Sequence, residues 1–162
     1  MQGRLIAVST SAGKGERKTP VPSALFIAGS GIEGDAHAGG GPRQVSLLAI
    51  ESFGRIRAKG LQVEPGDFAE NLTTEGIDLS ALRLGDRLLV GDSVELRITQ
   101  IGKECHDRCS VFELAGDCVM PREGIFASVE RGGAVRAAFG RFQTEEDVDR
   151  LVRAVDEAAR GR

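Results

Sequence analysis

The sequence has no tryptophan and no tyrosine, and it has only 7 phenylalanines among 162 residues. It therefore lacks the aromatic platforms on which single-stranded nucleic acid stacks. A net charge of −3 also argues against generic nucleic-acid binding. No signal-peptide pattern opens the sequence, and no run approaches the roughly 18 apolar residues of a membrane span. We therefore expect a cytoplasmic protein that has neither nucleic acid nor a membrane as its partner.

Cysteine and histidine are also scarce, with 3 and 2 residues respectively. An odd number of cysteines in a reducing compartment does not form a disulfide framework, so free thiols are expected. Two cysteines, one histidine and two cations nevertheless fall within residues 103–109, KECHDRC. Because neighbouring cations lower the pKa of a thiol and favour the reactive thiolate, this stretch predicts a thiolate site. Cys118, among apolar neighbours, is typical of a buried thiol.

A structural zinc site is the less favoured interpretation of the same stretch. Cys105 and His106 are adjacent and point in different directions on an extended chain, and the spacing from Cys105 to Cys109 has no matching second pair. The same divergence makes a catalytic dyad between these neighbours awkward. His37 is the alternative base, if the fold brings it close to Cys105.

Short apolar runs separated by glycine predict a mainly β fold, a barrel or a sandwich, in one main domain. A turn at residues 131–133 predicts a hairpin. The predicted strands are Arg4–Ser9, Val21–Ile27, Gln44–Leu48, Arg87–Val90, Val94–Ile101, Ile125–Glu130 and Ala134–Ala137.

Helices are fewer in this prediction. Helical spacing is seen over Leu47–Lys59 and over Thr144–Ala159, and the latter begins with an N-cap residue and an acidic first turn. A short helical turn is expected over Cys109–Ala115. The basic, glycine-containing segment Ala12–Pro22 is expected to form a mobile loop.

Two polar stretches are candidates for ligand contact. Glycines in residues 31–43 would let the backbone approach a ligand, and Arg43 adds a fork suited to phosphate or carboxylate. The same stretch could equally be a connection whose Asp35 and His37 bind local backbone groups. In residues 65–72, Asp and Asn more often hold turns than bind ligands. Arg122 and Glu123 are predicted either to line the site or to form a charge pair at a strand entrance.

Several segments together resemble the MOSC domain, the module named for the carboxy-terminal domain of molybdenum-cofactor sulfurase. They occur in the family's order over about residues 3–137, and the small free-standing bacterial members are the most similar. The matching segments are Gly34–Gly39, Arg43–Leu48, Pro65–Leu72, Leu84–Leu88, Ile101–His106 and Gly116–Phe126.

The resemblance implies a MOSC-type β-barrel with a few helices, and a role in sulfur handling or molybdenum-cofactor binding. The family's characteristic cysteine falls on Cys105, which would carry sulfur as a persulfide or ligate molybdenum. Either role needs an accessible, soft, deprotonated sulfur. His37 would transfer a proton or orient the acceptor, and Asn71 and Glu123 would line the site. Four cations are candidates to contact the cofactor's phosphate: Arg43, Lys103, Arg108 and Arg122.

The predicted organisation is a MOSC domain over residues 1–138 and a helical extension over residues 139–162. Residues 135–152 resemble the final segment of cysteine desulfurases. The pyridoxal-phosphate domain of those enzymes is missing, so this chain is not expected to bind pyridoxal phosphate. The helix would either dock a desulfurase supplied by another chain or, as the favoured alternative, pack over an open barrel end.

The leading hypothesis is thus a sulfur carrier in which a cysteine desulfurase supplied in trans loads Cys105 and a small anionic acceptor receives the sulfur. The first alternative is a molybdenum-cofactor carrier with Cys105 as metal ligand and no sulfur transfer. The second is a thiol-dependent or metal-assisted enzyme that acts on an unrelated small molecule, since a fold does not determine function.

Overall fold

Strands form two sheets in the computed structural model, which describes residues 1–105, 109–137 and 151–155. The larger sheet has the order β11-β7-β8-β9-β5-β6-β1-β2, and the smaller has the order β10-β3-β4. Among the described pairs only β5 and β6 run parallel. The strands are β1 (Gln2–Thr10), β2 (Thr19–Val21), β3 (Ser23–Ile27), β4 (Gly31–Ile32), β5 (Val45–Ala49), β6 (Leu72–Glu75), β7 (Arg87–Val90), β8 (Val94–Ile101), β9 (Ile125–Arg131), β10 (Gly133–Arg136) and β11 (Leu151–Val155).

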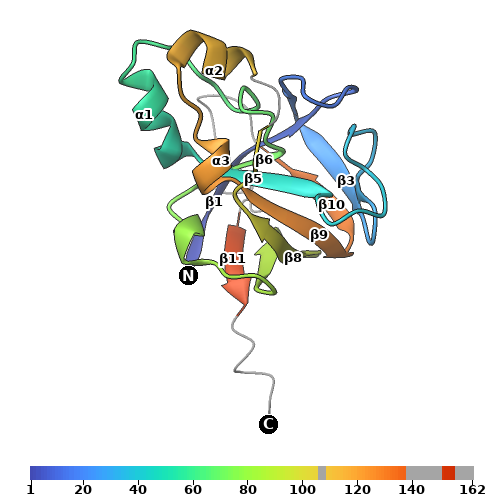
Figure 1. Cartoon of the computed structure of the whole chain (residues 1–162). Coiled ribbons are helices and arrows are strands. Elements are labelled where there is room, and N and C mark those ends of the chain that lie inside the picture. Colours follow the sequence, from blue (N-terminus) through green and yellow to red (C-terminus); the bar gives the residue numbers. More distant parts are fainter. Residues whose placement is uncertain (106–108, 138–150, 156–162) are drawn as a thin grey trace.

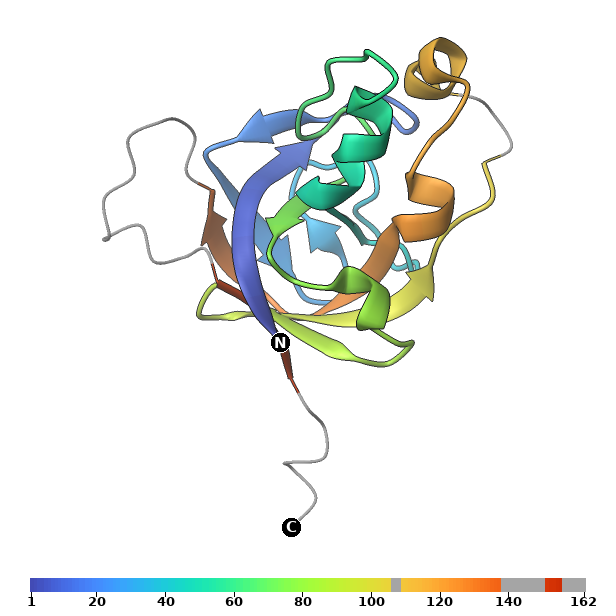
Figure 2. The same ribbon diagram turned by 90° about the vertical axis from the view of Figure 1, so that its left-hand side faces the viewer.

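The larger sheet curves around its own core (Figure 2). β11 pairs with β7 on one side and with β1 on the other, so the pairings return from one end of the sheet to the other. β2 and the three-stranded sheet lie outside this circuit, and the strands as a whole do not make one closed barrel. The prediction of a mainly β fold with few helices is confirmed.

β5 separates two hydrophobic clusters, which explains why its residues are apolar without alternation. Leu47 packs into the main core inside the curved sheet, whereas Leu48 packs into a second cluster. β9 behaves in the same way, because Ile125 joins the main core and Phe126 the second cluster. A strand that is covered on both faces needs apolar residues on both.

Helices cover the outer face of β5 and enclose the second cluster (Figure 1). Phe53 of α1 meets Phe68 edge-to-face, with ring centroids 4.9 Å apart. Cys118 belongs to this cluster, and Cys109 packs against it. The helices are α1 (Phe53–Arg57), α2 (Ser110–Ala115) and α3 (Met120–Glu123), with short 3₁₀ turns η1 (Ile50–Ser52) and η2 (Leu79–Ala81).

Each predicted strand overlaps an observed one. The run Val21–Ile27 is divided between β2 and β3 at Pro22, which has no backbone N–H to donate. β4 and β6 were not predicted from the sequence. The helix predicted over Leu47–Lys59 is shorter than expected because its first residues belong to β5. The short helix predicted near Cys109 is confirmed as α2.

The hairpin predicted at residues 131–133 is wrong. β10 pairs with β3 of the other sheet and not with β9. At Gly132 the chain passes so close to β3 that a Cβ atom would lie 2.3 Å from the carbonyl oxygen of Phe26. The glycine therefore permits a crossing between sheets instead of a tight turn.

The C-terminal helix predicted over Thr144–Ala159 is also wrong where it can be compared, because Leu151–Val155 is strand β11. The two free edges of β7 and β1 give this segment hydrogen-bond partners on both sides, and this pairing overrides its helical spacing. Residues 138–150 and 156–162 lie outside the described residues. The boundary near residue 138 and the docking role of the extension therefore stay predictions.

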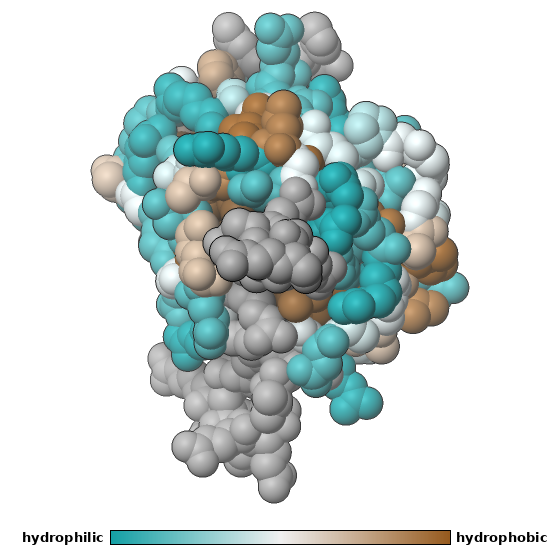
Figure 3. Space-filling view, turned by 90° about the horizontal axis from the view of Figure 1, so that it is seen from below, coloured by the Kyte–Doolittle hydropathy of each residue, from teal (hydrophilic) through white to brown (hydrophobic). Residues whose placement is uncertain are grey.

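Seen from below, the described surface is mainly hydrophilic, and its hydrophobic side chains lie in separate small groups (Figure 3). Large exposed hydrophobic residues include Leu25 in β3, Leu84 in the loop before β7 and Leu114 in α2. No helix in residues 1–105, 109–137 or 151–155 has the length and apolar character needed to cross a bilayer.

Candidate functional site

Four of the predicted site residues surround one small pocket of about 50 Å³. Arg43 precedes β5, Asn71 precedes β6, and Lys103 follows β8. Because β5 and β6 run parallel, Arg43 and Asn71 lie at the same end of these two strands. His37 completes the predicted group. The remaining lining residues are Gly15, Ser46, Ala69, Met120 and Phe126.

Asn71 joins three strands behind the pocket. Its Oδ1 accepts hydrogen bonds from the backbone N–H and the hydroxyl of Ser46, each at 3.1 Å, and its Nδ2 donates to the carbonyl of Ser9 at 3.0 Å. The side chain is buried, and these bonds use most of its polar capacity. Asn71 thus holds the pocket wall, while a direct contact with a ligand stays a prediction.

Glu70 holds the loop that precedes β6. Its carboxylate accepts hydrogen bonds from the backbone N–H groups of Gly66 and Phe68 and from the hydroxyl of Thr73, at 2.7, 3.1 and 2.8 Å. Burial raises the pKa of Glu70, and these hydrogen bonds oppose that rise. Ala69 adopts a left-handed backbone with φ of 62°. A strained backbone conformation at a pocket wall needs such a surrounding frame to persist.

Lys18 was missed at the sequence level, where residues 12–22 were predicted to form a mobile loop. Its side chain is fully buried, and its Nζ lies 2.6 Å from Oδ1 of Asp35. It is also 3.3 Å from Nδ1 of His37, which lines the pocket. Burial alone would raise the pKa of Asp35, but the Lys18 ammonium and the backbone N–H groups of His37 and Ser11 outweigh it and hold the value far below the ordinary range.

Two cations face the pocket from different segments. The Nε of Arg43 donates to Oε1 of Gln100 at 2.7 Å, and its guanidinium lies 5.5 Å from the centre of the Phe126 ring. Lys103 is set in place by Gly102, whose left-handed backbone passes so close to Pro121 that a Cβ would lie 2.4 Å from its carbonyl oxygen. The pocket therefore has the charge and the donors to hold a small anion.

The three thiols lie in three different environments. Cys105 is exposed, Cys109 is half-buried and Cys118 is buried. Burial raises the pKa of the Cys118 thiol to about 11, and the nearby thiols of Cys109 and Cys105 add to this increase. Cys118 is therefore protonated at neutral pH, which agrees with its predicted structural role. Cys105 is two residues beyond the pocket residue Lys103.

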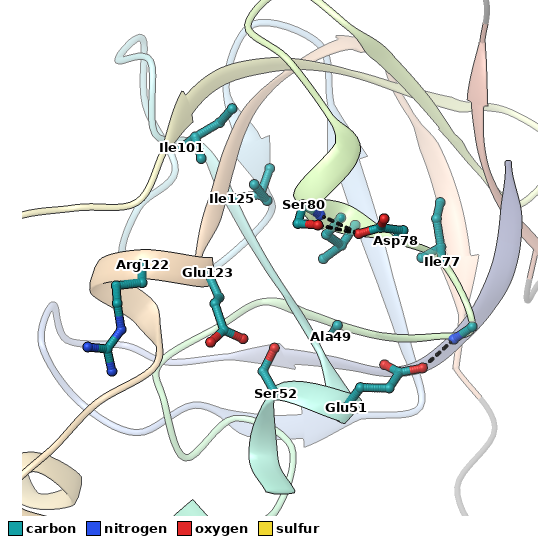
Figure 4. A pocket seen from close by; sticks show the side chains of 12 residues that line it. Ala49, Glu51, Ser52, Ile77, Asp78, Ser80, Ile101, Arg122, Glu123 and Ile125 are labelled. Carbon is teal, nitrogen blue, oxygen red and sulfur yellow. Dashed lines mark hydrogen bonds between the residues drawn. The ribbon is translucent and has the colours of Figure 1, made fainter. Parts of the chain in front are cut away.

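Arg122 and Glu123 are not brought to this pocket. They line a second, larger cavity of about 550 Å³ (Figure 4). Glu123 forms an ion pair with Arg55 at 3.1 Å, and Arg122 forms one with Asp117 at 3.0 Å. Both residues thus form ion pairs just before β9, but with other residues and not with each other as the alternative interpretation expected. Arg108 and His106 lie outside the described residues.

The larger cavity has an apolar wall and a rim of carboxylates. Ala49, Ile77 and Ile125 contribute apolar surface. Glu51 accepts a hydrogen bond from the N–H of Gly76 at 2.7 Å, and the hydrogen bonds from Ser80 lower the pKa of Asp78 (Figure 4). The described residues contain no group of three or more histidine, cysteine, aspartate and glutamate side chains placed to hold a metal ion.

Comparisons with known proteins agree with this architecture. A family model described as MOSC domain matches residues 34–142. Among solved structures, the YuaD protein from Bacillus subtilis has a TM-score of 0.71 and 20% sequence identity over 94% of each chain. YiiM from Escherichia coli has a TM-score of 0.63 and 20% identity, over 95% of this chain and 70% of its own. YiiM from Geobacillus stearothermophilus has a TM-score of 0.68 and 16% identity, over 95% and 75% of the two chains.

At these identities the solved structures show a shared fold, and no curated protein gave a match. The family match itself covers more than half of the sequence and contains Arg43, Asn71, Lys103 and Cys105. The chain therefore belongs to the MOSC domain family, which is known for binding related to the molybdenum cofactor.

Proposed function

We propose that this chain handles sulfur, with Cys105 carrying it as a persulfide to an anionic acceptor. One observation carries the proposal: of the three cysteines, the exposed one follows directly on a cation-lined pocket. Two residues of chain span at most about 7 Å, so the backbone of Cys105 lies within that distance of the backbone of Lys103. An acceptor whose anionic group occupies the pocket would thus place the rest of itself near the thiol.

The chemistry asks for an accessible thiolate, and only one cysteine suits it. The raised pKa of Cys118 keeps that thiol protonated, and its burial closes it to a partner protein. Cys109 packs against the second hydrophobic cluster just before α2. Cys105 is exposed. Its role as sulfur carrier therefore follows from exposure and position together.

The transfer consists of two displacements at sulfur. The Cys105 thiolate attacks the outer sulfur of a donor persulfide, the donor's S–S bond breaks, and the donor cysteine leaves as a thiolate. Cys105 then holds the outer sulfur through a new S–S bond. A nucleophile of the acceptor attacks that sulfur in turn, and the Cys105 thiolate leaves. The sulfur keeps its oxidation level in the loading step, and in the second step the electron pair of the new bond comes from the acceptor's nucleophile, so no external oxidant or reductant takes part.

The pocket supplies binding and orientation for this transfer. Arg43 is held by Gln100 and by the face of Phe126, so its guanidinium loses little freedom when it binds an anion. Lys103 adds a second positive charge from the segment that leads to Cys105. The donor we propose is a cysteine desulfurase-type protein acting in trans.

A molybdenum-cofactor carrier is the alternative, and the types of residue present suit the chemical groups of that cofactor. When bound, the cofactor would supply a thiophilic metal and an anionic phosphate. Cys105 would be the soft ligand, and Arg43 and Lys103 would hold the phosphate. At about 50 Å³ the pocket is well below the roughly 300–1,000 Å³ that enclose a drug-sized ligand, so it would hold one small group.

The test is to incubate the protein with a cysteine desulfurase and cysteine and then to weigh it intact. The wild type should gain the mass of one sulfur atom. Cys105→Ser should gain none, while the matched control Cys109→Ser should gain as much as the wild type. Sulfur loading that is absent from the wild type, or unchanged in Cys105→Ser, contradicts the proposal.

The alternative has its own readout. Protein purified without oxygen should be analysed for molybdenum and pterin. Stoichiometric cofactor that is lost in Cys105→Ser, together with no sulfur gain from the desulfurase, would replace sulfur transfer by metal binding as the role of Cys105.

A further inference from the structure

The buried ammonium of Lys18 has as many hydrogen-bond partners as it has protons. Its Nζ lies 2.6 Å from Oδ1 of Asp35, 3.2 Å from Oγ of Ser11 and 3.3 Å from Nδ1 of His37. The side chain is fully buried, so solvent does not take the place of any of these partners. An ammonium group has three donors and no acceptor.

Each partner must therefore offer a lone pair. For His37 this means that Nδ1 accepts, and an imidazole that accepts at Nδ1 carries its proton on Nε2. The competing contact for this ring nitrogen is Oδ2 of Asp35, at 3.6 Å, which is beyond hydrogen-bond range. That oxygen already accepts the backbone N–H of His37 at 3.0 Å.

The other edge of the ring is left to the pocket. His37 lines the pocket with about a third of its side chain exposed, and no described residue is a hydrogen-bond partner of Nε2. Arg43 and Lys103 face the same space. A proton on Nε2 would thus add a third donor to a site that already has two cations.

We propose that Lys18 is a positioning residue that holds His37 as the neutral imidazole protonated at Nε2, so that His37 donates to an anionic group in the pocket. Of the two roles expected for His37 from the sequence, proton transfer and orientation of the acceptor, this assigns it the second. The anion half of the inference rests on the proposed function of the pocket, whereas the tautomer does not depend on sulfur transfer.

The backbone of Lys18 is also fixed in place. Its backbone N–H donates to the carbonyl of Gly66 at 2.8 Å. Gly66 has a φ of +94°, and a Cβ there would lie 2.0 Å from the carbonyl oxygen of Lys18. Because Glu70 binds the N–H of Gly66, the buried lysine is connected to the same frame that shapes the pocket wall.

Nitrogen-15 NMR on protein labelled at histidine tests the tautomer directly, because the chain has only 2 histidines. A His106→Gln variant assigns the signals of His37. At neutral pH we expect its Nε2 at the protonated position and its Nδ1 at the unprotonated position. A proton on Nδ1, or on both nitrogens, would overturn the inference.

Removal of Lys18 tests its part in this arrangement. Lys18→Met should convert the single tautomer into a mixture of two. If Lys18→Met does not fold, Lys18→Met with Asp35→Asn removes both buried charges and leaves an oxygen for the backbone donors. A folded variant that keeps the wild-type tautomer would show that Lys18 does not select it.

Inorganic phosphate is the probe for the donor role. Its addition should shift the Nε2 signal of His37 in the wild type, and the shift should require clearly more phosphate in Lys103→Ala. A confirmed tautomer with no phosphate response would overturn the donor role. Failure of persulfide loading would instead count against the proposed function and leave the tautomer intact.

Discussion

Two cavities among the described residues have opposite character. The smaller one, about 50 Å³, is lined by Arg43 and Lys103 beside an exposed thiol. The larger one, about 550 Å³, is mainly apolar and carries carboxylates at its rim. Volume alone would select the larger cavity. Charge and reactive groups select the smaller.

The two cavities also differ in how their polar groups are held. Behind the small pocket, Lys18 and Asn71 are buried and connect segments far apart in the sequence. At the larger cavity, Asp78 binds Ser80, only 2 residues away, in an exposed turn. A site that orients a reactive group benefits from buried side chains that connect distant segments. The comparison therefore supports the small pocket as the functional one.

The largest expected effect is from Asp35→Asn. Breaking a buried ion pair leaves Lys18 uncompensated and should cost about 3–5 kcal/mol of unfolding free energy at pH 7. Because the pKa of Asp35 is lowered on folding, its stabilisation is present above its ordinary value of 3.8 and is lost as the pH falls toward the native value. Urea unfolding should therefore show that the difference in unfolding free energy between Asp35→Asn and the wild type becomes smaller as the pH falls.

Asp78→Asn at the larger cavity is the matched control for that experiment. Asp78 is exposed and binds only its own turn, so its replacement should leave the urea midpoint nearly unchanged. Equal losses of unfolding free energy for the two variants at neutral pH would contradict the distinction between the buried and the exposed carboxylate. So would a difference between Asp35→Asn and the wild type that grows in acid.

Glycine substitutions should give the next largest difference. Gly66→Ala combines a left-handed backbone with a clash at 2.0 Å against the backbone of Lys18, so we expect a loss of about 2–5 kcal/mol. Gly76→Ala at the larger cavity has a similar φ of +73° but open space for its Cβ. It should cost only about 1–2 kcal/mol for the backbone strain. Thermal or urea unfolding distinguishes the two, and equal losses would contradict the close contact.

Anion affinity separates the cavities by charge. Lys103→Ala should weaken the binding of inorganic phosphate roughly tenfold, because a hydrogen bond to a charged group contributes about 1.5–3 kcal/mol. Arg122→Ala, at the larger cavity, should leave the affinity unchanged, since Arg122 is paired with Asp117. Isothermal titration calorimetry measures both. A larger loss for Arg122→Ala would place the anion in the larger cavity.

The smallest expected effect is from Glu123→Gln. This change breaks the ion pair between Arg55, whose side chain is 47% exposed, and Glu123, whose side chain is 32% exposed. Such an exposed pair contributes at most about 1 kcal/mol to the unfolding free energy. Persulfide loading by a desulfurase should be unchanged. If persulfide loading fell as far in Glu123→Gln as in Cys105→Ser, the larger cavity would take part in sulfur transfer.

The sequence predicted the part of the site that depends on residue type. The stretch 103–109 was singled out by its thiols and cations, Cys105 within it by the resemblance to the MOSC domain, and Arg43 by the glycines before it. The turn-holding interpretation of residues 65–72 is confirmed for Asp67, whose carboxylate accepts the N–H of Glu64, but not for Asn71, whose side chain bonds strands β1 and β5. A local pattern is enough to indicate groups that carry chemistry themselves or act on nearby backbone.

The buried frame could not be predicted in the same way. Lys18 lies in a polar segment typical of loops, and its burial depends on Asp35, 17 residues away, and on the backbone of Gly66. The only local indication was Asp35 itself, an acidic residue in a glycine-rich stretch. β11 shows the same limit, because its strand form comes from the edges of β7 and β1 and not from its own spacing.

Site-resolved trapping of the persulfide in the wild-type protein tests the central claim most directly. After incubation with a cysteine desulfurase and cysteine, persulfides are alkylated and each cysteine-containing peptide is analysed by mass spectrometry. The account predicts the added sulfur on Cys105 and none on Cys118. Sulfur found on Cys118 or Cys109 in preference to Cys105, or on no cysteine, would contradict it.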